Sequence, residues 1–306
     1  MHDIVIVGAG PAGLTAAIYA CRASKSVLVL EARSYGGQIV NTPSIENYPV
    51  EMNISGFDFA VRLYEQAKAL GAEIVFEKAV GMEDNGRYKT VVTPKNRYDA
   101  KAVILATGSE NRKLGLEGED ELIGRGLSYC ATCDGNFYRK KTVAVVGGGN
   151  TALEDALYLS DLAAKVYLIH RRDAFRGEER TARRLREKEN VEPVLDSVVT
   201  ALNANRKLTS VCVLNKKTGE TREIALDGLF VAVGRVPENV SFEKYIDLDE
   251  AGYAASGENC RTKTPGLFVA GDNRAKDVRQ LVTATADGAV AATEAVKYIS
   301  SLETED

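Results

Sequence analysis

The sequence predicts an α/β protein with two three-layer domains, each built around a parallel sheet, one of them inserted into the other. Three observations predict this class. Near the N-terminus an apolar run, a glycine-rich turn, an alanine-rich segment and a second apolar run follow one another, and the same order recurs from residue 143. Strand–helix–strand units of this kind place their strands in parallel. Segments expected to complete the first domain lie at both ends of the chain.

The first unit comprises an expected strand at residues 4–7, a turn at 8–13 (GAGPAG), a helix over 14–23 and a strand at 27–30. The second has its strand at 143–146, its turn at 147–152 (GGGNTA), its helix over 153–164 and its next strand at 166–169. A glycine fingerprint alone is weak. Between a strand and a helix it predicts a Rossmann-type dinucleotide site, because glycines let the backbone approach a pyrophosphate at the helix N-terminus.

The second strand of the first unit ends at Glu31, 23 positions after Gly8. An acidic residue there hydrogen-bonds a ribose hydroxyl and would repel a 2′-phosphate. The first site is therefore expected to take a nucleotide with a free ribose, such as FAD.

The same offset of 23 from Gly147 gives His170, followed by Arg171 and Arg172, with Arg176 close by. Arginines bind a 2′-phosphate through charge-assisted, forked hydrogen bonds. The second site is therefore expected to take NADPH. The alternative is an ordinary solvated basic face, since the segment through residue 186 is strongly basic.

Two further segments support the flavin site. The strand expected at residues 102–105 runs into Thr107 and Gly108, and a late strand ends in Gly271 and Asp272. The acid at that strand end could accept hydrogen bonds from sugar or ribityl hydroxyls, although a plain strand followed by a turn would look the same. We therefore expect an FAD domain at residues 1–113 and 241–306, with an NADPH domain at 114–240 inserted between them.

Cys130 and Cys133 form a C-x-x-C motif between the two fingerprints, and Asp134 follows them. The motif could be half of a zinc site, two unrelated cysteines, or a redox pair. Zinc would need a second ligand pair, and the chain offers two histidines and three other, scattered cysteines, so we expect no metal. The position favours a redox dithiol with a lowered thiol pKa. Asp134 is a candidate acid/base, or else an ordinary turn carboxylate.

The composition excludes other classes. The 306 residues are 45% hydrophobic and 27% charged, and the net charge of −4 argues against nucleic-acid binding. No apolar run approaches the length of about 20 residues that spans a bilayer, and no signal peptide is evident, so a cytoplasmic protein without membrane contact is expected.

Taken together, the motifs resemble the low-molecular-weight, bacterial-type thioredoxin reductases, nearly from end to end. The segments that carry this resemblance lie at residues 8–13, 36–38, 106–108, 130–134, 147–152, 170–176 and 271–272. The resemblance implies a homodimer that passes electrons from NADPH to FAD, to the Cys130/Cys133 disulfide and then to thioredoxin. It implies that Cys133 faces the flavin, that Cys130 attacks thioredoxin and that Asp134 donates a proton.

The resemblance also completes the sets of expected cofactor-binding residues, and places Gln280 near the flavin ring and Glu154 near the nicotinamide. For FAD these residues are Gly8, Gly10, Pro11, Ala12, Gly13, Glu31, Gly37, Gln38, Asn47, Thr107, Gly108, Gly271, Asp272 and Gln280. For NADPH they are Gly147, Gly149, Asn150, Thr151, Glu154, His170, Arg171, Arg172 and Arg176.

The chain departs from many members of this family at Tyr129, Asn136 and Asn273. The first two positions bear on partner docking, so the partner could instead be another thioredoxin-like protein. The motifs would also suit a flavin redox sensor with little turnover, a ferredoxin-dependent reductase or a flavin dithiol oxidase. A ferredoxin-dependent reductase or a flavin dithiol oxidase would not use NADPH, so neither would need the arginines after His170.

Overall fold

The computed structural model describes residues 1–42 and 44–304 and divides the chain into two compact units. One unit joins Met1–Glu110 with Val236–Asp306, and the other is Asn111–Arg235. The boundaries expected from the sequence, after residues 113 and 240, lie three and five residues further along the chain. The chain leaves the first unit in β7 (Ser109–Asn111) and returns in β16 (Arg235–Pro237), and these strands pair in a two-stranded sheet.

The first unit is built on a seven-stranded sheet in the order β3-β2-β1-β6-β5-β4, in which β17 also pairs with β6. The long strand β6 makes this possible, because its first half pairs antiparallel with β5 and its last three residues pair parallel with β17. Pairing among β1, β2, β3 and β6 is parallel. The strands are β1 (His2–Val7), β2 (Val27–Leu30), β3 (Glu73–Val75), β4 (Gly81–Asp84), β5 (Lys89–Val92), β6 (Arg97–Leu105) and β17 (Leu267–Val269).

Both faces of this sheet are buried. Alternate residues of the central strands enter two separate cores, so that Ile4 and Ile6 of β1 lie in one and Val5 and Val7 in the other. This explains why the central strands read as continuous apolar runs. The first core also contains side chains from the helices, and the second contains Phe242 from the 3₁₀ segment η4 (Val240–Tyr245).

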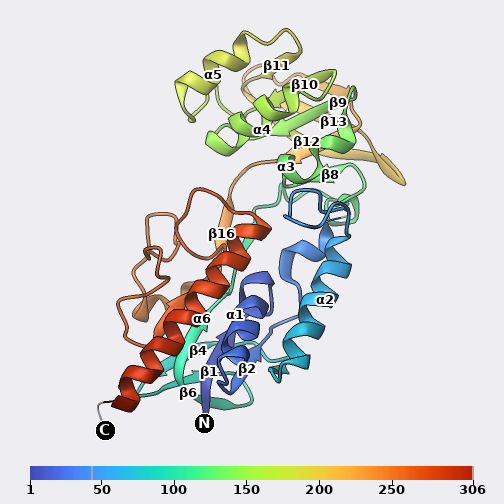
Figure 1. Cartoon of the computed structure of the whole chain (residues 1–306). Coiled ribbons are helices and arrows are strands. Elements are labelled where there is room, and N and C mark those ends of the chain that lie inside the picture. The colour runs from blue at the N-terminus through green and yellow to red at the C-terminus, as the bar shows by residue number, and fades with distance from the viewer. Residues whose placement is uncertain (43, 305–306) are drawn as a thin grey trace. The chain divides into compact units, whose positions relative to one another are not determined.

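Helices α1 (Pro11–Arg22) and α6 (Leu281–Thr304) lie side by side in this unit (Figure 1). Gly288 of α6 permits the close approach, because a Cβ there would stand 2.1 Å from the carbonyl oxygen of Ala12. Helix α2 (Gly56–Ala69) also packs on α1, and Ser55 caps it by accepting a hydrogen bond from the Asp58 N–H at 3.0 Å. The 3₁₀ segment η1 (Gly37–Asn41) precedes α2.

The second unit has a five-stranded parallel sheet in the order β11-β10-β9-β15-β8 and a separate antiparallel sheet β12-β13-β14. The parallel strands are β8 (Leu127–Ser128), β9 (Thr142–Val146), β10 (Lys165–Ile169), β11 (Val191–Val194) and β15 (Gly228–Val231). The antiparallel strands are β12 (Ser197–Asn205), β13 (Lys207–Asn215) and β14 (Thr221–Ala225).

The parallel sheet of the second unit is again covered on both faces. Val143 and Val145 pack with residues of α4 (Asn150–Ser160) and α5 (Glu179–Arg186), while Ala144 and Val146 pack with residues of the antiparallel sheet. The remaining elements are α3 (Ala131–Asp134), η2 (Asp120–Leu122) and η3 (Gly135–Tyr138). The predicted α/β class, with a three-layer parallel-sheet core in each unit, is therefore confirmed.

Within residues 1–42 and 44–304, every helix is too short or too polar to cross a membrane.

Candidate active site: two glycine turns and a disulfide

The first glycine turn joins β1 to α1 and leaves no space for side chains at two of its positions. A Cβ on Gly8, where φ is +108°, would stand 2.3 Å from the carbonyl oxygen of Ala106. A Cβ on Gly13 would stand 1.9 Å from the carbonyl oxygen of Gly8. By contrast, the nearest atom to a Cβ on Gly10 would be 4.0 Å away. The first and third glycines therefore serve packing, and the second leaves open space at the start of α1.

The carboxylate of Glu31 lies beside this turn. Its Oε2 accepts a hydrogen bond from the N–H of Ala9 at 2.7 Å, and its Oε1 accepts one from the N–H of Arg33 at 2.8 Å. A carboxylate has about four acceptor positions, so two remain for ribose hydroxyls. The carboxylate is thus held against the glycine turn where the sequence offset placed it.

The loop that carries Gly37 and Gln38 also meets the turn. The N–H of Gly36 donates to the carbonyl oxygen of Ala9 at 2.8 Å, and a Cβ on Gly37 would lie 3.3 Å from Cα of Gly10. Gly37 has a φ of +60° and is exposed, as is Gln38. The backbone of this loop therefore borders the open space at Gly10.

Residues distant in the sequence complete the candidate FAD site of the first unit. The Asn47 amide Nδ2 donates to Oε1 of Gln280 at 3.1 Å, which joins two of the expected FAD-binding residues across 233 positions of the chain. After β6, Thr107 carries a buried hydroxyl that has no hydrogen-bond partner in the described part of the chain, and Gly108 follows with a φ of +73°. A buried hydroxyl without a partner is unusual and fits a polar ligand group.

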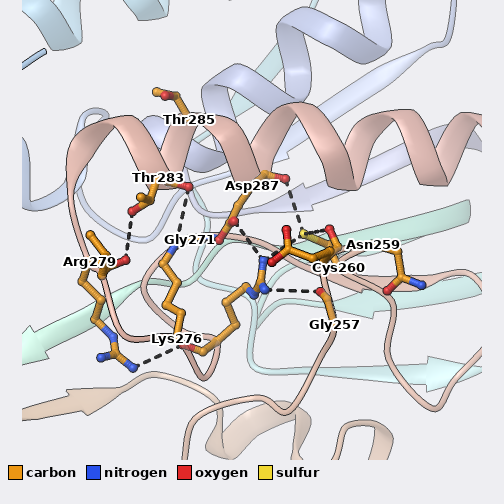
Figure 2. Close-up of polar contacts among 12 residues, drawn as sticks. Gly257, Asn259, Cys260, Gly271, Lys276, Arg279, Thr283, Thr285 and Asp287 are labelled. Atoms are coloured by element: carbon orange, nitrogen blue, oxygen red, sulfur yellow. Dashed lines mark hydrogen bonds and ion pairs between the residues drawn. The ribbon is translucent and has the colours of Figure 1, made fainter. Parts of the chain in front are cut away.

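Gly271 and Asp272 follow β17, and a charge cluster on α6 holds their turn. Figure 2 shows Asp287 of α6 at the centre of these contacts: Oδ2 accepts from the Gly271 N–H at 2.9 Å and from Lys276 Nζ at 2.7 Å. Oδ1 accepts from Arg274 Nη1 at 2.9 Å. All three charged side chains are largely buried. The cluster therefore fastens the loop from Gly271 toward Gln280 onto α6.

Asn273, where the sequence departs from many thioredoxin reductases, is fully buried in this loop. The side-chain Nδ2 of Asn273 donates to the carbonyl oxygen of Leu105 at 3.0 Å, and the main-chain carbonyl oxygen of Asn273 accepts from Asn239 Nδ2 at 2.7 Å. The Leu105 carbonyl oxygen also accepts from the N–H of Ala270 at 2.9 Å, so the amide of Asn273 gives the last carbonyl of β6 a second donor.

The second glycine turn joins β9 to α4 in the second unit. A Cβ on Gly147 would stand 2.3 Å from the carbonyl oxygen of Ala232. A Cβ on Gly148 would stand 2.2 Å from Cε1 and Nδ1 of His170, whereas a Cβ on Gly149 would meet nothing within 4 Å. Open space therefore again lies at the glycine that precedes the helix.

His170 and the arginines after it take different positions. The His170 ring is buried directly against Gly148, and burial lowers its pKa, which favours the neutral ring. The arginines Arg171, Arg172 and Arg176 are exposed. The N–H of Arg176 donates to the carbonyl oxygen of Gly148 at 2.7 Å, which ties this basic segment to the turn.

The start of α4 is fixed from the same side. Oδ1 of Asn150 accepts from the N–H of Glu178 at 2.8 Å, while Thr151 and Glu154 are exposed on the helix. Asp155, next to Glu154, has its pKa raised to about 7, mainly by burial and then by the charge of Glu154. Sequence reasoning did not single out Asp155.

The residues around the two glycine turns can be compared with what binding of FAD and NADPH requires. In each unit the helix begins at an open glycine, and a carboxylate or an arginine segment lies where the ribose recognition was expected. Two buried polar atoms, Oγ1 of Thr107 and Nε2 of His170, lack partners in the part of the chain that the structure describes. The residues therefore fit FAD in the first unit and NADPH in the second.

Cys130 and Cys133 form a disulfide in the second unit, with α3 beginning at Ala131 between them. Both cysteines are partly exposed. Asp134 ends α3, and its Oδ2 accepts a hydrogen bond from the hydroxyl of Ser128 at 2.6 Å. Burial raises the pKa of Asp134, and the bond from Ser128 partly opposes this increase. A carboxyl with a raised pKa next to a disulfide is suited to donate a proton to a leaving thiolate.

Tyr129 precedes the disulfide and turns its hydroxyl to a buried carboxylate. It donates to Oε1 of Glu119 at 2.7 Å, and the same carboxylate accepts from the N–H groups of Leu114 and Gly115, each at 2.8 Å. The tyrosine thus anchors the chain before Cys130 to a loop of its own unit. Its hydroxyl is occupied by this internal bond.

The other three cysteines are free thiols. Cys260 is fully buried and Cys21 and Cys212 are partly buried. In the described residues, no three His, Cys, Asp or Glu side chains are grouped in a way that could hold a metal ion. Sequence reasoning also missed Ser128, Glu119 and Asp287. Their importance depends on contacts, and no motif marks them.

Comparison with known proteins places this arrangement in a family. The family model described as pyridine nucleotide-disulphide oxidoreductase matches residues 2–288. The chain is 44% identical to a thioredoxin reductase of Treponema pallidum over 303 residues, covering 99% of this chain and 98% of that one. It is 40% identical to a thioredoxin reductase of Bacillus subtilis over 304 residues, covering 99% of this chain and 96% of that one.

A solved structure agrees with these relatives. The crystal structure of thioredoxin reductase from Streptococcus pyogenes superposes with a TM-score of 0.94 at 40% identity, and covers 98% of this chain and 99% of that chain. The glycine turns and the C-x-x-C disulfide carry the resemblance found in the sequence. The chain therefore belongs to the pyridine nucleotide-disulphide oxidoreductase family, among the thioredoxin reductases.

Proposed function

We propose that the protein is an NADPH-dependent thioredoxin-disulfide reductase that uses FAD. The observation that carries this proposal is the Cys130–Cys133 disulfide next to Asp134, a partly buried carboxyl whose pKa is raised by burial. This disulfide lies in the same unit as a glycine turn with three exposed arginines beside it. A dithiol, an acid and a nucleotide turn are the parts that a disulfide reductase needs.

FAD would be held by the turn at Gly10 and by Glu31, with Asn47, Asp272 and Gln280 expected toward the rest of the cofactor. NADPH would be held by the turn at Gly149, with Arg171, Arg172 and Arg176 around the 2′-phosphate and Glu154 toward the nicotinamide. When bound, the two cofactors supply the electron pair that reduces the internal disulfide to a dithiol.

The side chains of this protein then carry out the thiol chemistry. Cys130 attacks a sulfur of the partner disulfide as a thiolate: a bond forms between the two sulfurs, the partner's own S–S bond breaks, and Asp134 gives its proton to the departing thiolate. Asp134, now a carboxylate, takes the thiol proton of Cys133, and the Cys133 thiolate attacks Cys130. The mixed disulfide breaks, the internal disulfide forms again, and the partner's second sulfur leaves as a thiolate that takes this proton, so the partner departs as a dithiol. The roles of the two cysteines follow the family resemblance.

The partner is expected to be thioredoxin, and the active form a homodimer in the cytoplasm. Relatives named thioredoxin reductase support this choice of partner. A reductase of another thioredoxin-like protein would use the same residues, so the partner is decided by turnover.

The deciding experiment adds NADPH to the holoenzyme without oxygen and then adds an oxidised disulfide protein. We expect the flavin absorbance to fall and then recover, with one NADPH consumed for each thioredoxin disulfide reduced. Flavin reduction without any transfer to thioredoxin would support a redox sensor and contradict the proposal. Faster turnover with a different thioredoxin-like protein would replace thioredoxin as the partner.

A further inference from the structure

We propose that Ser128 is a positioning residue for disulfide exchange, because its hydroxyl joins the main chain of Cys130 to the carboxyl of Asp134. This inference rests on the proposed function. It assigns to the reaction a side chain outside the C-x-x-C-D motif.

The geometry leaves one consistent arrangement of protons. The Ser128 hydroxyl donates to Oδ2 of Asp134 at 2.6 Å and accepts from the N–H of Cys130 at 3.0 Å. Its oxygen also lies 3.3 Å from the Cys130 carbonyl oxygen. A hydroxyl has one hydrogen, and the shorter contact to the charged acceptor is the stronger bond. The chain of donors thus runs from Cys130 through Ser128 to Asp134.

Ser128 is attached to the rigid part of the unit. It is 4% exposed and ends β8, where it pairs with Phe230 of β15 in the parallel sheet. The cysteines, in contrast, lie at and within the four-residue helix α3. When the disulfide opens and closes, the sheet therefore offers a fixed point to which both Cys130 and Asp134 are bound.

The second oxygen of the carboxyl is in a different environment. Oδ1 of Asp134 is buried and has no hydrogen-bond partner in the described part of the chain. A proton on Oδ1 leaves the bond from Ser128 to Oδ2 intact. Ser128 therefore directs the proton of the acid to the oxygen that the protein leaves unpaired.

The bond also sets the range in which the acid titrates. A donor to a carboxylate favours its charged form, so the hydroxyl opposes the increase in the pKa of Asp134 that burial causes. Removing the hydroxyl should raise that pKa further. Ionisable side chains on the elements packed against α3 are Tyr138 of η3 and Glu154, Asp155 and Tyr158 of α4. Of these, Tyr138 has its pKa raised to about 12, mainly by burial and then by the charge of Asp134.

The test measures the rate at which iodoacetamide alkylates Cys130 and Cys133 in the dithiothreitol-reduced holoenzyme, as a function of pH and residue by residue. We expect a step in the wild-type profile that Asp134→Asn removes. Ser128→Ala should move that step to higher pH and slow thioredoxin turnover about tenfold, the loss expected for one hydrogen bond to a charged group. Reduction of the flavin by NADPH should not change.

A matched control is available in the same unit. Ser197 is also 4% exposed, and its hydroxyl donates to the carbonyl oxygen of Leu195 at 2.7 Å, away from the motif. Ser197→Ala should leave the alkylation profile unchanged. A Ser128→Ala profile equal to the wild type would overturn the proposal.

A double variant separates positioning from folding. If Ser128 acts through Asp134, then Ser128→Ala combined with Asp134→Asn should exchange thiols no more slowly than Asp134→Asn alone. Additive losses would overturn the inference. The alkylation measurement needs neither NADPH nor thioredoxin, so failure of the proposed function would appear separately, as a wild-type enzyme that does not turn over.

Discussion

Two adjacent glycines in the second turn allow binding of NADPH to be separated from packing of the fold. Gly149 leads into α4 with a φ of −93°, which alanine also adopts, and a Cβ there would meet nothing within 4 Å. Gly148 is buried, and its Cβ would lie 2.2 Å from two atoms of the His170 ring. Alanine should therefore be tolerated by the fold at Gly149 and not at Gly148.

The magnitudes follow from these contacts. Gly148→Ala forces the buried His170 ring to shift, and overpacking of this kind lowers the free energy of unfolding by about 1–3 kcal/mol. Gly149→Ala fits the backbone and should leave that free energy unchanged or raise it by about 0.4–1 kcal/mol, because alanine restricts the unfolded chain. Its methyl group would hold a pyrophosphate away from the backbone. Losing one charge-assisted hydrogen bond of about 1.5–3 kcal/mol weakens NADPH binding about tenfold to a hundredfold.

The assay combines thermal unfolding with titration of NADPH into each holoenzyme variant. We expect an unchanged transition and weak NADPH binding for Gly149→Ala, and an earlier transition for Gly148→Ala. Gly10→Ala gives the corresponding test for FAD, since its Cβ would have no atom closer than 4.0 Å. If Gly149→Ala binds NADPH as tightly as the wild type, the backbone of this turn does not approach the cofactor and the reasoning is refuted.

Three further predictions concern the disulfide, the arginines after His170 and Asp155. Cys133→Ser should keep FAD and its reduction by NADPH but lose disulfide reduction, so normal thioredoxin turnover would exclude the pair as the redox centre. Losing one of Arg171 and Arg172 should weaken NADPH binding about tenfold to a hundredfold and hardly affect NADH; an unchanged NADPH/NADH ratio for Arg171→Ala with Arg172→Ala in a binding titration would contradict the assignment. Asp155, whose folded-state pKa is raised from 3.8 to about 7, binds its proton more tightly when folded, so its contribution to stability falls as pH rises between those values. Asp155→Asn should therefore flatten the pH dependence of urea unfolding in that interval and stabilise the protein at pH 8; a variant less stable than the wild type at pH 8 would show that the carboxylate is favourable there.

Local patterns in the sequence were sufficient to predict the framework of both units. The strand expected at residues 27–30 is β2, and the one expected at 143–146 lies within β9. The internal disulfide is also as predicted. Within each unit, the two strands of the strand–helix–strand motif pair in parallel, as predicted. These features are local, because the periodicity of a strand, the position of a glycine and the spacing of a dithiol are visible within a few residues.

Features that depend on distant contacts could not be predicted in this way. His170 was expected among the NADPH-binding residues by its offset, but an offset does not show that its ring is buried against Gly148. Asp287 lies on the second turn of α6, and its pairing with Arg274 and Lys276 requires the folded loop. Ser128 is likewise recognised only when β8 brings its hydroxyl to Asp134. The cofactor-binding roles stay predictions.

The measurement that tests the central claim most directly counts the thiols of the holoenzyme by differential alkylation and mass spectrometry. NADPH is added without oxygen, one portion of the sample is alkylated, and oxidised thioredoxin is added to the rest before alkylation. We predict that NADPH exposes two new thiols, at Cys130 and Cys133, and that thioredoxin returns both to the disulfide while becoming a dithiol itself. A flavin that is reduced while this disulfide stays closed would contradict the proposed electron path.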